Sequence, residues 1–211
     1  MRFLVVLDVD STLIEDEVIE LLAEEAGSLL EVADITARTM EGELDFEESL
    51  RCRVATLAGL PVSVFGSVRQ RVRTTPGAAR LISGVHAAGG AVGVVSGGFA
   101  EIVGPIADEL ALDYWRANAL EIAGGMLSGG LTGPIVHAEA KAEALIEWAG
   151  HFGVPLSRTV VVGDGANDLR MMALAGLSVG FDAKAPVRAA ADVVLDVRDL
   201  SQVLPLLGLR G

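Results

Sequence analysis

Residues 3–12 read Phe-Leu-Val-Val-Leu-Asp-Val-Asp-Ser-Thr, an apolar run that ends abruptly in polar residues. The run is short and β-branched at Val5 and Val6, which is typical of a strand buried on both faces of a parallel sheet. Asp8 and Asp10 then lie at the carboxyl end of the predicted strand. This segment therefore predicts an α/β fold with two carboxylates at one edge of the sheet.

Two later segments repeat the pattern of a short apolar strand followed by polar residues. Ala91–Val95 runs into Ser-Gly-Gly at 96–98, and Thr159–Val162 runs into Gly-Asp-Gly at 163–165. In open parallel sheets, ligands bind outside the carboxyl ends of the strands. The three polar clusters are therefore expected to form one site.

The rest of the chain alternates between strand and helix patterns. Further short strands are predicted at Leu177–Gly180 and Val193–Leu195. Helical patterns cover Pro76–Ala88, Ala100–Leu110, Ala138–His151, Ala166–Ala175 and Pro186–Ala190. The alternation predicts a doubly wound parallel sheet.

Residues 14–73 interrupt this alternation. The stretch has no convincing strand and reads as consecutive amphipathic helices, such as Val18–Ala26 and Phe46–Leu57. We interpret 14–73 as an inserted helical cap on a catalytic core made of 1–13 and 74–211. The glycine-rich segment 122–133 is expected to be a hairpin or a loop.

Composition excludes several classes of protein. The 211 residues carry a net charge of −13 without a basic cluster, which argues against nucleic acid or an anionic membrane as the main partner. The apolar run after Met1 is shorter than a signal-peptide core, so a cytoplasmic protein is expected. Cys52 is the only cysteine, which rules out an intrachain disulfide, and we expect it to be a buried, unreactive side chain.

Paired carboxylates such as Asp8 and Asp10 suit divided labour in catalysis. One can attack phosphorus while the other donates a proton to the leaving alkoxide and later takes one from water. Gly163 to Asp168 adds two carboxylates, and an oxygen-only ligand set suits Mg²⁺. Taken alone, each motif also reads as an ordinary turn or helix cap rich in Asp and Gly.

Two further features fit a phosphate site. The hydroxyl and amides of 96–98 precede a predicted helix and can receive phosphate oxygens there. Lys141, on the helix before the third strand, can neutralise phosphate and orient Asp8. Taken alone, the motif at 96–98 is a weak signal, and Lys141 also reads as a solvated surface charge on a helix.

Taken together, Asp-x-Asp, then Ser, then Lys, then Gly-Asp-x-x-x-Asp resembles the signature of the haloacid dehalogenase superfamily. Within it, DVDSTLIEDE at 8–17, MEGELDFEESLRCRV at 40–54, VVSGGF at 94–99 and VVGDGANDLRMM at 161–172 resemble the phosphoserine phosphatase family. The resemblance covers essentially the whole chain. It implies a Mg²⁺-dependent phosphatase that acts on L-phosphoserine, either as a monomer or as a homodimer, in the last step of serine synthesis.

The resemblance also implies a role for each motif residue. Asp8 would be the nucleophile and Asp10 the general acid and base. Magnesium would be held by Asp8, Asp164 and the Asp10 backbone carbonyl, with Asp168 holding a metal-bound water or Lys141. The phosphate would be bound by Ser96, Gly97, Lys141 and Asn167.

The cap residues would recognise the amino acid head of the substrate. Glu17 matches the residue that meets the ammonium, and Arg53 matches the arginine that holds the carboxylate. Met40 and Phe46 match residues that enclose the substrate. Without the resemblance, Glu17 reads as a helix-start acid, Arg53 as a surface charge and Phe46 as core.

Three alternatives stay open at this point. The chain could be a phosphatase for another small phosphomonoester such as phosphohomoserine, a phosphotransferase with the same core chemistry, or a silent binding module. A regulatory region that some family members carry before the first strand is not seen in the sequence, so feedback through such a region is not expected.

Overall fold

The run that opens the sequence forms β1 (Leu4–Leu7), the central strand of the sheet, in a computed structural model that describes residues 2–40 and 43–209. All of its side chains are fully buried. Val5 and Leu7 pack into one apolar cluster, while Leu4 and Val6 pack into a second cluster on the opposite face. Alternate side chains of a strand point to opposite faces, so this unbroken apolar run supplies both cores.

In the described residues, the sheet has seven strands in the order β4-β3-β2-β1-β5-β6-β7. All neighbouring pairs are parallel except β3 and β4. The other strands are β2 (Ala91–Phe99), β3 (Tyr114–Ala123), β4 (Met126–Thr132), β5 (Thr159–Gly163), β6 (Leu177–Phe181) and β7 (Val193–Leu195).

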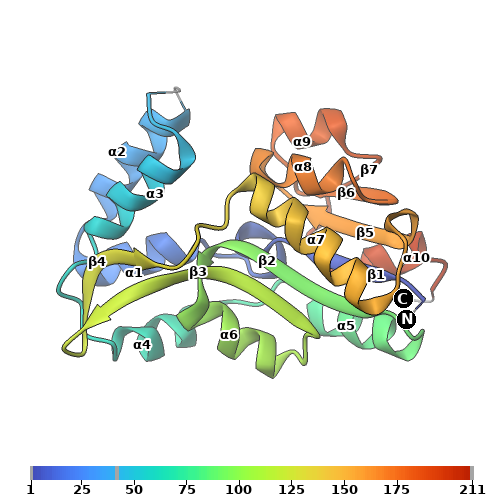
Figure 1. The fold of residues 1–211 in the computed structure, drawn as a ribbon, viewed down its shortest axis with the longest axis horizontal. Helices are drawn as coiled ribbons and strands as arrows, with labels where there is room; N and C mark the ends of the chain where they lie inside the picture. The colour runs from blue at the N-terminus through green and yellow to red at the C-terminus, as the bar shows by residue number, and fades with distance from the viewer. Residues whose placement is uncertain (1, 41–42, 210–211) are drawn as a thin grey trace.

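Helices cover both faces of the sheet, as a doubly wound fold requires (Figure 1). One face carries α5 (Ala78–Ala87), α6 (Ala100–Glu109) and α10 (Val203–Leu206); the other carries α7 (Ala138–Phe152), α8 (Leu169–Met172) and α9 (Ala185–Ala190). Short helical turns lie at Leu156–Arg158, Ala166–Asp168 and Leu200–Gln202. None of the helices in the described part of the chain has both the length and the apolarity of a membrane span.

Four helices follow the first strand and form the inserted cap: α1 (Val18–Ala26), α2 (Leu29–Met40), α3 (Phe46–Ala55) and α4 (Val64–Arg71). An antiparallel bridge pairs Ile14 with Thr74, where the chain leaves the core and returns to it. This pairing supports 14–73 as the cap segment, a boundary that stays a prediction. The chain between α3 and α4 also meets the β3–β4 hairpin, since Pro61 and Met126 form a second bridge.

The structure confirms a hairpin at 122–133, which forms the tip and second strand of a β-hairpin whose first strand, β3, begins earlier, at Tyr114. It corrects two other expectations. The predicted helix 166–175 is a single turn followed by the short α8. Cys52 is exposed rather than buried, because it lies on the outer face of α3.

Candidate active site

The two carboxylates after β1 are held by a wide helical turn, η1 (Val9–Leu13). Asp8 continues the ladder, since its amide donates to Val162 O at 2.9 Å, and its Oδ1 accepts from the Val9 amide at 2.8 Å. Asp10 Oδ1 accepts from the Val18 amide at 2.9 Å, at the start of α1. The turn therefore aims both carboxylates at the same end of the sheet.

Lys141 reaches these carboxylates from α7 and is completely buried. Its Nζ donates to Asp8 Oδ1 at 2.7 Å and to Asp168 Oδ1 at 2.8 Å. The second oxygen of Asp168 accepts from the Gly165 amide at 3.2 Å, so both of its oxygens are engaged. The alternative of a solvated surface lysine is thus excluded, and Lys141 is a buried counter-ion beside Asp8.

Burial and neighbouring charges shift the pKa values of Asp8 and Lys141. Burial raises the pKa of Asp8 well above its usual value, the Asp168 carboxylate raises it further, and Lys141 partly offsets both. Burial alone would lower the pKa of Lys141, but Asp168 and Asp8 outweigh it and raise the pKa. One ammonium thus serves two carboxylates, which leaves excess negative charge for a cation to balance.

A third carboxylate, Asp164, completes a possible metal site. Oxygen atoms of Asp8, Asp164 and Asp168 all lie within 4.8 Å of one another, and the three residues are buried. Carboxylate oxygens at this spacing fit a hard divalent cation such as Mg²⁺. Asp164 Oδ2 also contacts Lys184 Nζ at 3.0 Å, so a second ammonium borders the same position.

The Ser-Gly-Gly segment at 96–98 lies beside Asp10. Ser96 Oγ accepts from the Gly98 amide at 2.7 Å and donates to Asp10 Oδ2 at 3.3 Å. A Cβ at Gly98 would come within 2.8 Å of Asp10 Oδ2, so this close approach requires glycine. The segment and Asp10 therefore fix each other's position.

Asp10 is suited to exchange a proton near neutral pH. Burial raises its pKa to about 7, and the nearby Glu17 carboxylate contributes in the same direction. A carboxyl group with such a pKa can hold a proton for a leaving group and can later accept one from water.

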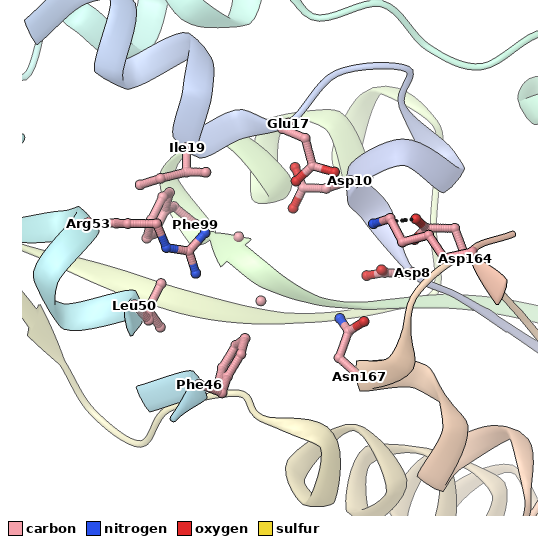
Figure 2. A pocket seen from close by; sticks show the side chains of 13 residues that line it. Asp8, Asp10, Glu17, Ile19, Phe46, Leu50, Arg53, Phe99, Asp164 and Asn167 are labelled. Atoms are coloured by element: carbon pink, nitrogen blue, oxygen red, sulfur yellow. Dashed lines mark ion pairs between the residues drawn. The ribbon is translucent and has the colours of Figure 1, made fainter. Parts of the chain in front are cut away.

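A cavity of about 110 Å³ opens onto these groups, and side chains from the cap line its other side (Figure 2). Its lining residues are Asp8, Asp10, Glu17, Ile19, Phe46, Leu50, Arg53, Gly97, Gly98, Phe99, Asp164, Asn167 and Lys184. The structure thus brings together in one cavity residues predicted from four separate stretches of sequence.

The cap contributes one acidic and one basic side chain to the cavity wall. Glu17 Oε1 accepts from Ser11 Oγ at 2.7 Å, and Arg53 Nε donates to Ser49 O at 3.3 Å. Burial lowers the pKa of Arg53 and raises that of Glu17. Among the described residues Arg53 forms no ion pair. Its remaining guanidinium donors face the cavity, as Figure 2 shows. Phe46 lies on the cavity wall, while the side chain of Met40 lies outside the described residues.

Sequence reasoning missed several members of this site. Lys184 is the main one, and Ile19, Leu50 and Phe99 add apolar wall. Lys184 follows β6, so it occupies the same place after a strand as the three predicted clusters. A search for charged residues after every strand would have found it.

The fold and the site define a phosphoryl-transfer class of hydrolase, and comparison with known proteins agrees. The sequence profile of the haloacid dehalogenase-like hydrolases matches residues 5–173. The chain belongs to this haloacid dehalogenase-like hydrolase family, within its phosphoserine phosphatase branch.

Named relatives and a solved structure support the branch. The chain is 55% identical to a phosphoserine phosphatase of Streptomyces coelicolor over 98% of its own length and 50% of the relative's. It is 48% identical to that of Streptococcus thermophilus, over 98% of the chain and 96% of the relative. A structure described as a phospho-aspartyl intermediate analogue of phosphoserine phosphatase has a TM-score of 0.91 and 41% identity, and covers 97% of this chain and 98% of its own. The chain thus spans about half of the first relative and nearly all of the second.

Proposed function

We propose that the chain hydrolyses O-phospho-L-serine to L-serine and phosphate, which would place it at the last step of serine synthesis. The observation that carries the substrate is the presence of one acidic and one basic side chain, Glu17 and Arg53, in the wall of the cavity that Asp8 also lines. L-Phosphoserine presents an ammonium and a carboxylate beside its phosphate. A substrate without an amino acid head would gain nothing from that pair.

The chemistry follows from the two carboxylates after β1. An Asp8 oxygen attacks phosphorus, the bond from phosphorus to the serine oxygen breaks, and that oxygen takes the proton of Asp10. Asp10, now ionised, removes a proton from a water molecule that attacks the aspartyl phosphate. Phosphate then leaves, and Asp8 and Asp10 return to their starting states.

Magnesium is the cation that we propose for the carboxylate site. Asp8, Asp164 and the Asp10 backbone carbonyl would hold it, and Asp168 would orient a bound water or Lys141. When bound, the ion offsets the repulsion between the Asp8 carboxylate and the phosphate. The carboxylates of Asp8, Asp164 and Asp168 are buried close together, and the buried Lys141 ammonium pairs with only two of them, which supports a divalent cation here.

The remaining residues position the substrate. Ser96, the Gly97 amide, Lys141 and Asn167 would receive phosphate oxygens. Glu17 would meet the ammonium, Arg53 the carboxylate, and Phe46 and Met40 would enclose the serine carbons. We further propose a cytoplasmic enzyme that is a monomer or a homodimer.

The assignment is tested by phosphate release from L-phosphoserine, O-phosphohomoserine, phosphothreonine and p-nitrophenyl phosphate, each with Mg²⁺ and with EDTA. We expect turnover only with Mg²⁺ and a preference for L-phosphoserine. Its kcat/KM should exceed that of p-nitrophenyl phosphate, which has no amino acid head, by more than about tenfold, the effect of one good charged contact. O-Phosphohomoserine and phosphothreonine carry the same ammonium and carboxylate, so a lower kcat/KM on them reports the fit of the carbons between the head and the phosphate. Metal-dependent turnover without that preference would contradict L-phosphoserine as the substrate but would still support the proposed mechanism. Absence of turnover would favour a silent module.

Arg53→Ala is expected to lower kcat/KM for L-phosphoserine by roughly 10- to 100-fold, since a charge-assisted hydrogen bond to a carboxylate contributes about 1.5–3 kcal/mol. The loss for p-nitrophenyl phosphate should be much smaller, because that substrate has no carboxylate. Steady-state kinetics on both substrates measures the difference.

Arg51 provides the matched control. It lies on the same helix but is exposed and pairs with Glu47. Arg51→Ala should leave both substrates within about twofold of wild type. Equal losses on the two substrates in Arg53→Ala would mean that Arg53 does not read the carboxylate.

A further inference from the structure

One buried polar side chain has contacts that neither the sheet nor the proposed chemistry explains. Asn118 lies on β3, is 2% exposed, and stands in register with Phe99 of β2. The β2–β3 ladder is interrupted just before this pair, because its register shifts between Val95 and Phe99. The interruption releases the Ser-Gly-Gly segment at 96–98 from the ladder, so its main chain needs other partners.

The Asn118 side chain supplies one of these partners. Its Nδ2 donates to Gly97 O at 2.7 Å, and its Oδ1 accepts from the Val136 amide at 2.8 Å. Both ends of the amide are therefore used on main-chain groups from two different segments. A buried amide that is satisfied at both ends fixes those segments relative to each other.

Each of the two segments leads to a group that we assign to the phosphate. Gly97 lines the cavity, and the next amide, of Gly98, is held by Ser96 Oγ. Val136 directly precedes His137, whose Nδ1 accepts from the Ala140 amide and caps α7. Lys141 lies in the first turn of that helix, where its amide donates to His137 O at 3.0 Å. A single side chain thus connects the segment 96–98 of β2 to the start of the helix that carries Lys141.

We propose that Asn118 is a positioning residue for phosphate, which sets the distance between the Gly97 main chain and the α7 start. This inference rests on the proposed phosphatase function but does not depend on which phosphomonoester is the substrate. Without the Asn118 amide, Gly97 O and the Val136 amide would have to find new partners, and either segment would shift. Even a shift of about 1 Å at a catalytic constellation lowers rates by roughly 100-fold.

The test uses two variants and one control. Asn118→Leu keeps a similar volume and removes both hydrogen bonds, while Asn118→Asp keeps the acceptor for Val136 and loses the donor to Gly97. Ser178→Ala is the control: Ser178 is also a buried polar residue of the sheet, on β6, and is paired with Asp192 away from the cavity. Thermal unfolding first shows that each protein is folded at the assay temperature.

Two quantities are then measured with Mg²⁺ present: kcat on p-nitrophenyl phosphate, and the dissociation constant of inorganic phosphate by calorimetry. Both Asn118 variants should weaken phosphate binding about tenfold and lower kcat by roughly 10- to 100-fold, whereas Ser178→Ala stays within twofold of wild type. A merely structural role would lower the unfolding temperature of all three variants alike and leave phosphate affinity unchanged.

The outcomes separate this inference from the proposed function. Wild-type phosphate affinity and kcat in a folded Asn118→Asp protein would overturn the positioning role, whatever the substrate. If wild type turns over p-nitrophenyl phosphate but not L-phosphoserine, the substrate proposal fails and the Asn118 comparison still stands. If wild-type protein binds no phosphate at all, both proposals fall.

Discussion

Asp8→Asn should abolish turnover, with a loss of at least about 10⁴-fold in kcat, because an amide oxygen is a poor nucleophile towards phosphorus. The fold should remain, since Asn keeps the size of Asp and its carbonyl can still accept from the Val9 amide and from Lys141. Initial rates on L-phosphoserine and a thermal unfolding curve measure the two expectations.

Asp108→Asn is the matched control, because Asp108 is an exposed carboxylate near the end of α6 and does not line the cavity. It should keep wild-type rates. Acid quenching of wild type during turnover, followed by mass spectrometry, should detect one phosphoryl group on the peptide that contains Asp8. Residual activity above about 1% in Asp8→Asn would exclude Asp8 as the nucleophile, since nucleophile removal costs far more than that.

The sequence predicts best those parts of the site that come directly after a strand. β1, β2 and β5 each read as a short apolar run followed by a polar cluster, and parallel pairing brings these ends to one edge. The neighbourhood of Asp8, Ser96 and Asp164 therefore follows from the pattern alone. Glu17 and Arg53 did not follow from this pattern. Without the family resemblance, they are better interpreted as a helix-start acid and a surface charge.

The parts that sequence misses depend on contacts between distant segments. β3 contains Arg116, Asn118 and Glu121, and such polar residues give no clear strand signal until the edge pairing with β2 and β4 is known. Asn118 matters only because a register shift in β2 brings the Gly97 carbonyl within hydrogen-bond reach of its side chain. Lys184 likewise gains its meaning from Asp164, which lies on another loop.

Lys141→Met should destabilise the protein by about 3–5 kcal/mol, which is the usual cost of removing one partner of a buried ion pair. Met keeps the length and apolar stem of the side chain, so the loss reports the charge. Asp8 and Asp168 would then face each other as buried carboxylates without their shared ammonium. Urea unfolding in EDTA measures the change in the free energy of unfolding.

Arg170→Met is the control, because Arg170 is 65% exposed and its pairing with Glu139 is solvent-screened. Its cost should stay below about 1 kcal/mol.

Adding Asp168→Asn to Lys141→Met should recover part of the lost stability, because it removes one of the two uncompensated charges. That recovery distinguishes an electrostatic origin from simple loss of packing, which a second substitution at Asp168 would only increase. If Lys141→Met alone costs less than about 1 kcal/mol in EDTA, the two carboxylates do not both carry charge in the folded protein. The excess negative charge that argues for a divalent cation beside Asp164 would then be absent, so this stability measurement also tests the metal site without any assay of turnover.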